Sequence, residues 1–445
     1  MHDVEARAPN AAETRWMTLG IVTVMVGIGS GLGGMAFGLL LRLVQHLAYG
    51  YSIHSVISRE SFLQGVSASS PVRRLLVLSV CGVVAGAGWW AVYRFGSSLV
   101  SVSKAVGANG PRMPFLTTVS HDLLQIVTVA LGSPLGREVA PRELGAVLAT
   151  WLSSRAALSP ENSRTMIACG AGAGLAAVYN VPLAGAFFTL EVLLRTFSLS
   201  ALIPAIATCV IATLVAWIGL GDQAVYALPS LAISQSLVIW SIVTGPLFGF
   251  AAFWFVRATQ AARAHAPRGW HLPLWCVAAF SVIGLLSMPF PQLLGNGRSV
   301  TQLSFQSDVG LALAVTLLVL RLIITIGVLR AGAEGGLLTP GLTVGALLAT
   351  VIGILWNLAD PSVPVAAFAV VGGAAFLASS MKMPLTAIAL SVEFTRVSHD
   401  FLIPISFAVA GSNAVTCLCC LRKTQMLQDT TVSALERSGV AMRPI

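Results

Sequence analysis

The sequence predicts an all-α polytopic membrane protein, on the grounds of composition, apolar segment length and an internal repeat. The chain has 445 residues and a mean hydropathy of +0.85. Hydrophobic residues make up 56% of it and charged residues only 10%, against about 25% charged in soluble domains. A membrane-spanning helix needs about 20 apolar residues, and such segments follow one another along nearly the whole chain.

The expected helices fall into two groups on either side of a more polar stretch near 220–235. The first group is 16–49, 74–99, 114–133, 142–157, 165–195 and 199–220. The second is 232–256, 271–290, 308–330, 337–358, 364–380, 384–396 and 401–421. Several of these segments are too short, or too interrupted by Gly and Pro, to be simple spans.

An internal repeat relates the two groups. Residues 132–150 line up with 332–350, with glycines in register and the endings Gly-Ala-Val-Leu-Ala-Thr and Gly-Ala-Leu-Leu-Ala-Thr. Downstream, 170–185 resembles 372–387, and each block leads to an acid, Glu191 or Glu393. We therefore predict two homologous halves in one membrane domain, as in many transporters.

The expected organisation follows from these boundaries. It comprises a polar N-terminal segment (1–15), a first half (16–225), a second half (226–421) and a C-terminal tail (422–445). No cleavable signal peptide is expected, because the first fifteen residues are polar and the next apolar run is too long. Basic residues in the tail and between the helices of the second half place both termini in the cytoplasm of an inner-membrane protein.

Other classes of function find little support. The formal net charge is +9, from 26 basic and 17 acidic residues, but the basic residues are spread thinly, so no nucleic-acid partner is expected. His121-Asp122 is the most enzyme-like pair, yet it lacks a metal-spaced partner, and we interpret it as a solvated or interfacial helix end. We expect no enzymatic activity, no metal and no cofactor.

Glu138 is the principal candidate functional residue. It lies in Gly136-Arg-Glu-Val-Ala-Pro141, between two long apolar runs. A carboxylate at membrane depth costs about 2.5–3.5 kcal/mol on insertion scales, which favours a functional role. The aligned position in the second half is Leu338, so the acid is a specialised feature of one half, whereas the shared glycines are architectural.

Three segments predict broken helices whose first turns form an anion site. They are 107–113, where Asn109 or Gly110 would cap a helix that begins at Pro111, 136–141 and 335–340. A helix start presents unpaired N–H groups and a partial positive charge, and glycine allows close approach to the backbone. Each segment alone is better explained as a membrane-helix turn or as close helix packing. Three of them beside an intramembrane acid favour the anion site.

Other polar residues within apolar runs have structural interpretations. Glu191 and Glu393 are expected to cap helices or pair with arginine, and Arg321 to bind a carbonyl or acid inside the protein. Glu143 could serve a proton path, but we interpret it as interfacial. Arg137 either tunes Glu138 or reaches the interface.

These motifs resemble those of the CLC family of chloride channels and proton-coupled anion antiporters. The resemblance covers about 20–425 and rests on Ala108–Arg112, Gly136–Ala140, Gly336–Pro340, Gly174–Gly185, Arg321–Thr325 and Ala387–Glu393. It implies a homodimer with one anion pathway per subunit, and two inverted halves with many tilted, broken helices. Its partners would be the lipid bilayer, protons and small inorganic anions.

The resemblance also assigns roles to individual residues. Glu138 would be the gating glutamate that carries the proton. The anion sites would be lined by Asn109, Gly110, Gly136, Arg137, Val139, Leu337, Leu338 and Thr339, with Met426 a weaker member.

Departures from the family pattern bear on the choice of ion. Asn109 stands for a central serine, Val192 for an inner proton-transfer glutamate, and no tyrosine follows Tyr226. These departures resemble the fluoride/proton antiporter branch, so we expect fluoride to be favoured over chloride. A passive chloride channel and an ordinary chloride/proton antiporter are the alternatives.

Overall fold

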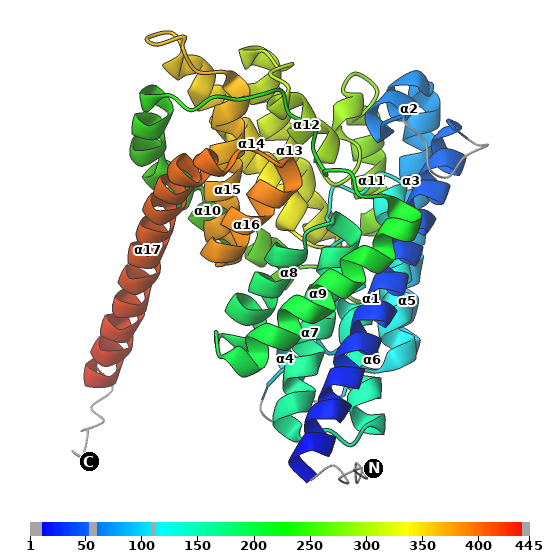
Figure 1. Ribbon diagram of the computed structural model, residues 1–445. Coiled ribbons are helices and arrows are strands. Elements are labelled where there is room, and N and C mark those ends of the chain that lie inside the picture. Colours follow the sequence, from blue (N-terminus) through cyan, green and yellow to red (C-terminus); the bar gives the residue numbers. More distant parts are fainter. Residues whose placement is uncertain (1–10, 53–59, 108–109, 111, 438–445) are drawn as a thin grey trace.

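The computed structural model describes residues 11–52, 60–107, 110 and 112–437, with only the backbone of 11–14, 420 and 422–437. Every regular element of this part is a helix, as the sequence predicts. Figure 1 shows the helices as one bundle, with α1 (Ala11–Tyr49) and α17 (Leu402–Arg437) as long helices on opposite sides.

The remaining helices of the first half range in length from four to 25 residues. They are α2 (Phe62–Ala68), α3 (Pro71–Phe95), α4 (Val102–Ala105), α5 (Phe115–Ala130), α6 (Val139–Arg155), α7 (Pro160–Tyr179), α8 (Pro182–Phe188), the π-helix η1 (Thr189–Leu194) and α9 (Leu199–Leu220). The expected segment 165–195 is thus three elements.

The second half repeats this pattern after a non-helical connection. Its helices are α10 (Gln235–Ala264), α11 (Leu272–Leu286), the 3-10 turn η2 (Pro291–Leu293), α12 (Arg298–Phe305), α13 (Leu311–Ala331), α14 (Leu338–Trp356), α15 (Val365–Met381), α16 (Pro384–Thr395), the 3-10 turn η3 (His399–Phe401) and α17. The last helix continues beyond residue 421.

The same local arrangement separates two consecutive helices in each half. Asn180 ends α7 with φ of +56°, and Pro182 then begins α8; Lys382 ends α15 with φ of +54°, and Pro384 begins α16. A left-handed residue ends a helix, and proline suits the first turn of the next.

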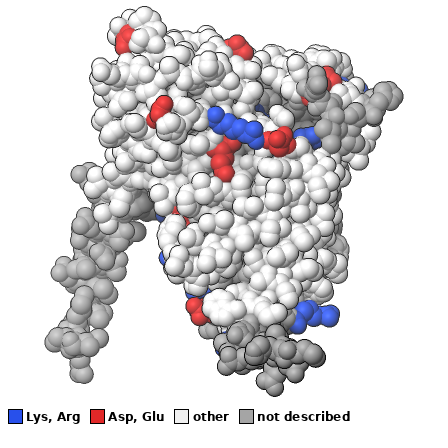
Figure 2. Space-filling view, in the orientation of Figure 1, with Lys and Arg blue, Asp and Glu red and all other residues white. Residues whose placement is uncertain are grey.

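The described residues contain seven helices that are long and apolar enough to cross a membrane, together with shorter apolar ones. Figure 2 shows one face of the molecule on which charged side chains are few and lie mainly toward the upper part and the lower edge. An uncharged belt of this kind is what the hydrocarbon core of a bilayer requires.

The centre of the bundle is built from α7 and α15, which are buried along most of their length. Helix α6 packs on α7, and α14 packs on α15. At Gly145 of α6 an added Cβ would lie 2.0 Å from the carbonyl oxygen of Gly170 in α7. Glycines therefore let these helices approach backbone to backbone, as small residues do in membrane proteins.

Glu191 and Glu393 cap helices of the opposite half. The Glu191 carboxylate accepts hydrogen bonds from the N–H groups of Leu385 and Thr386 at 2.9 and 2.8 Å. Glu393 accepts from Leu183 and Ala184 at 2.9 and 2.8 Å. The capping interpretation is confirmed, and reciprocal contacts of this kind are what a two-fold relation between the halves produces.

Arg321 is fully buried within α13 and binds carbonyl groups, as predicted. Its two terminal nitrogens donate to the oxygens of Leu293 and Gly295, each at 2.7 Å. These bonds fix the irregular segment around η2 against the bundle.

Candidate functional site

The first turns of α6 and α14 meet at a short antiparallel bridge. The N–H of Gly136 donates to the oxygen of Gly336 at 2.8 Å, and the N–H of Gly336 donates to the oxygen of Gly136 at 2.9 Å. These glycines are equivalent in the internal repeat, so the two halves meet at matching positions. Pro141 and Pro340 lie within the first turns of the two helices, as the sequence predicts.

The carboxylate of Glu138 lies at this junction and is 0% exposed. Its Oε1 accepts a hydrogen bond of 2.7 Å from the N–H of Leu338, the first residue of α14. Its Oε2 accepts a longer one, 3.4 Å, from the hydroxyl of Tyr179. A negative group thus occupies the start of α14, where unpaired N–H groups favour one.

The two bridging glycines make room for this carboxylate. An added Cβ would lie 2.1 Å from Oε2 at Gly136 and 1.9 Å from Oε1 at Gly336. Both distances are far inside van der Waals contact, so no residue with a side chain fits at either position while Glu138 stays in place.

A hydroxyl chain and two arginines surround the carboxylate. The Tyr179 hydroxyl lies 3.1 Å from that of Thr339, in the first turn of α14. The Arg137 guanidinium stacks over the Tyr179 ring, 5.2 Å from its centroid. Arg142, one turn along α6, is the basic group whose charge acts on Glu138. Tyr179 was not among the predicted site residues, although it lies in the segment Gly174–Gly185 that contributes to the family resemblance.

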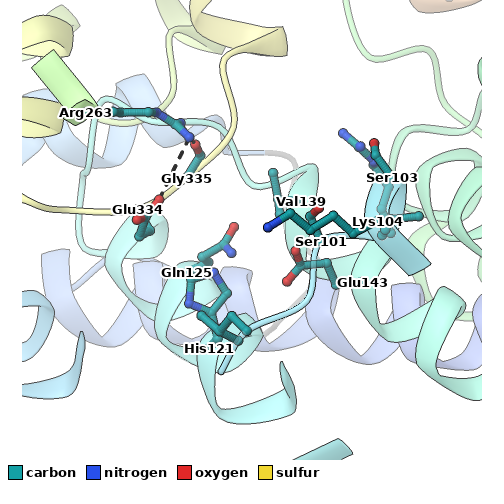
Figure 3. Close-up of a pocket in the computed structure, with 13 residues that line it drawn as sticks. Ser101, Ser103, Lys104, His121, Gln125, Val139, Glu143, Arg263, Glu334 and Gly335 are labelled. Atoms are coloured by element: carbon teal, nitrogen blue, oxygen red, sulfur yellow. Dashed lines mark hydrogen bonds and ion pairs between the residues drawn. The ribbon is translucent and has the colours of Figure 1, made fainter. Parts of the chain in front are cut away.

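A cavity of about 340 Å³ opens beside the junction (Figure 3). Val139 and Gly335, neighbours of Glu138 and Gly336 in the chain, form part of its wall. The rest of the wall comes from α4 and the residues before it, from α5, α6 and the end of α10, and from the connection between α13 and α14. It includes Ser101, Lys104, His121, Gln125, Arg142, Glu143, Arg263 and Glu334. The cavity is large enough to hold several water molecules.

Two predictions about polar residues in apolar helices are wrong. His121 and Asp122 lie in the middle of α5 at 6% and 0% exposure, so they are no solvated helix end. The His121 Nδ1 accepts a hydrogen bond from the Trp89 indole at 3.2 Å. Glu143 lines the cavity rather than an interface. The pattern along each helix alone suggested surface positions. The packing of α5 against α6 instead turns these side chains toward the interior of the protein.

The predicted helix start at Gly110 is also wrong. Gly110 is exposed and follows α4, with its N–H bonded to the oxygen of Gly107, and α5 begins only at Phe115. The helix that begins near the site is α4. Ser101 precedes its first residue, makes no capping hydrogen bond with its hydroxyl and lines the cavity. A four-residue helix carries too little sequence signal to be found in advance.

The structure brings together Gly136, Arg137, Glu138, Val139, Leu337, Leu338 and Thr339 at the starts of α6 and α14. Asn109 and the side chain of Met426 lie outside the described residues. Across the part of the chain that is described, no cluster of three or more His, Cys, Asp or Glu side chains could hold a metal ion.

Known proteins are similar to this sequence over most of its length. Residues 77–417 match the family described as "Voltage gated chloride channel". The "Voltage-gated ClC-type chloride channel ClcB" of Citrobacter koseri is 28% identical over 392 residues, which cover 84% of this chain and 90% of that protein. A "Putative chloride channel protein ClcB-like" of Ralstonia nicotianae is 28% identical over 410 residues, which cover 86% of this chain and 90% of that protein.

Solved structures share the fold. A slow cyanobacterial Cl⁻/H⁺ antiporter superposes with a TM-score of 0.77 at 22% identity, covering 90% of this chain and 94% of that one. A CLC-type fluoride/proton antiporter superposes with a TM-score of 0.66 at 21% identity, covering 92% of this chain and 97% of that one. The chain therefore belongs to the voltage-gated chloride channel family, the CLC family of anion transporters.

Proposed function

We propose that this protein is a proton-coupled anion antiporter in which Glu138 is the gate. The position of its carboxylate carries the proposal, because Oε1 accepts the N–H of Leu338 where α14 begins. An inorganic anion would be held there by the same N–H groups and the same helix dipole. Carboxylate and anion therefore exclude each other at one place.

This competition links the two ions. A proton on Glu138 removes the negative charge that the start of α14 favours, so the side chain can leave and an anion can enter. When the anion departs, the Glu138 carboxyl group gives up its proton to water, and the resulting carboxylate returns to the N–H of Leu338. The backbone of Gly136, Arg137 and Val139, and that of Leu337, Leu338 and Thr339, would line the anion's place.

Chloride is the anion that we propose, chiefly because of the names of the relatives. The Ser101 hydroxyl makes no capping hydrogen bond and lines the cavity, so it can donate to a passing anion. The ClcB relatives are named as chloride channels. The fluoride preference expected from the sequence rests on Asn109, on Val192 and on the absence of any tyrosine after Tyr226, and a fluoride/proton antiporter shares the fold.

The proposed test is ion flux from liposomes that hold the purified protein. Chloride and fluoride efflux are compared side by side while the external pH reports proton movement. We expect proton uptake that accompanies anion efflux, with chloride the faster ion. Anion efflux without proton movement would instead identify a passive channel, and faster fluoride would restore the fluoride assignment.

Two further expectations from the family resemblance are part of the proposal. The protein would be a homodimer in the inner membrane with cytoplasmic termini, and each subunit would transport alone. Size-exclusion chromatography with light scattering in mild detergent tests the dimer, and a monomer would count against it.

A further inference from the structure

The cavity beside Glu138 contains an acidic side chain that the gate does not use. Glu143 lies four residues after Val139, so the two residues share one face of α6. Both line the cavity, and Val139 directly follows Glu138 in the chain. The cavity wall is thus continuous from Glu143 to the neighbourhood of the gate, as Figure 3 shows for Glu143 and Val139.

Asp122 approaches Glu143 from the neighbouring helix α5. Its side chain is 0% exposed, and neither of its oxygens has a donor among the described residues. Helix α5 packs on α6, which carries Glu143, and the Glu143 Oε2 likewise has no donor among the described residues, so the two carboxyl groups interact as an unpartnered pair. Two ionised carboxylates are both acceptors, so this interaction is a hydrogen bond only when one of them carries a proton. A buried polar group without a partner is costly, which favours a shared proton.

Gln125 gives an independent indication of a water-filled path. It lies three residues after Asp122 on α5, lines the cavity and is 0% exposed. Within the described part of the chain, neither its side-chain oxygen nor its nitrogen has a partner. Water in the cavity satisfies such an amide, and a chain of water molecules conducts protons.

The charged groups around the pair suit the release of a proton. Arg142 follows Glu138 by four residues, and its charge acts on both Glu138 and Glu143. It therefore stabilises the carboxylate that is left when the proton moves on. Glu334 is held by Arg263 at 3.9 Å and by the Tyr93 hydroxyl at 2.9 Å. The His121 ring accepts a hydrogen bond from Trp89, and Lys104 lines the same cavity as Glu143.

We propose that Asp122 and Glu143 form the proton-loading site that serves Glu138. A proton from water in the cavity binds one carboxylate of the pair and is shared with the other. It then passes through cavity water along the Glu143–Val139 face to the Glu138 carboxylate, when that side chain has left the N–H of Leu338. This inference rests on the proposed function, because it requires proton-coupled transport.

The test uses the full-length protein in liposomes, with anion efflux and proton uptake measured together. The variants are E143Q, D122N and D122N/E143Q, with E161Q as the matched control, since Glu161 is exposed at the start of α7. We expect E143Q and D122N to slow proton uptake at least about tenfold, as loss of a positioned proton-transfer group does. Anion efflux should persist, and the double variant should match the single ones, because the pair acts as one unit.

The outcomes separate this inference from the proposed function. If the wild type moves protons and E138Q does not, yet E143Q and D122N keep wild-type coupling, the pair has no role and the gate stands. If the wild type moves no protons, both proposals fail. Equal loss of anion and proton flux in the variants would show a structural role and overturn the pair as a relay. If D122N does not fold, the proton uptake of E143Q tests the proposal. E143D keeps a carboxyl group at this position and is expected to restore proton uptake.

Discussion

Glu138 and Leu338 occupy equivalent positions in the two repeats, yet they meet at 2.7 Å, carboxylate oxygen to backbone nitrogen. The acid that distinguishes one half is therefore bound by the helix start of the other half. A single carboxylate controls a junction that the repeated glycines build symmetrically.

Replacing Glu138 by glutamine should abolish proton movement and leave anion flux. Glutamine has the shape of the protonated acid but cannot bind and release a proton. Parallel recording of anion efflux and pH in liposomes measures both. Proton-coupled flux at the wild-type level in E138Q would remove Glu138 from the mechanism.

Replacing Gly336 by alanine should uncouple the transporter while Glu138 remains present. The added Cβ would lie 1.9 Å from Oε1, so the carboxylate cannot occupy its place beside Leu338. The overpacking should also cost about 1–3 kcal/mol of stability. The ratio of proton to anion flux is the measurement.

Gly327→Ala is the matched control for this variant. Gly327 lies in α13, and an added Cβ there meets nothing within 4 Å. It should keep the wild-type ratio. Unchanged coupling in G336A would show that Glu138 works without this position.

Removing the cross-half caps should weaken the fold without changing the ion ratio. E191A and E393A each leave two helix N–H groups without their acceptor. Loss of a helix cap costs about 0.5–2 kcal/mol. The temperature at which the protein loses its size-exclusion peak should fall in both variants, whereas E161A, at an exposed site, should not lower it. A changed proton-to-anion ratio in E191A would point to a transport role instead.

Arg321→Met should destabilise the protein strongly. It removes the donors from the buried oxygens of Leu293 and Gly295, and each bond to a charged group is worth about 1.5–3 kcal/mol. Thermal unfolding in detergent measures the effect. Arg330→Met, at an exposed position of the same helix, is the control, and equal stability of the two variants would contradict the assignment.

The sequence predicted those parts of the site that depend on local chemistry. Glycine, acid and proline in 136–141 and 335–340 indicated two helix starts, and the repeat indicated that they belong together. The partner of each group could not be predicted, since Leu338 binding Glu138 is a contact across 200 positions. The helix start at Gly110 was wrong because Gly-Pro motifs also follow short helices, as here after α4.

The burial of polar side chains was the second feature that could not be predicted from the sequence. Asp122 and Glu143 each look like polar residues at a membrane interface when their own helices are considered separately. Only the packing of α5 against α6 places them in contact inside the protein. A polar residue in an apolar helix signals that a partner exists, but not which one.

The exchange of caps between α8 and α16 has a consequence for biosynthesis. While the ribosome is still making the connection near residue 230, the amide donors of Leu183 and Ala184 have already been synthesised, but Glu393 has not. Unpaired backbone groups cannot remain in lipid without a cost of several kcal/mol each. The first half must therefore wait in an unfinished form, shielded by water or by the insertion machinery, until the second half arrives. A cell that expressed either half alone would make a protein with no stable place in the bilayer.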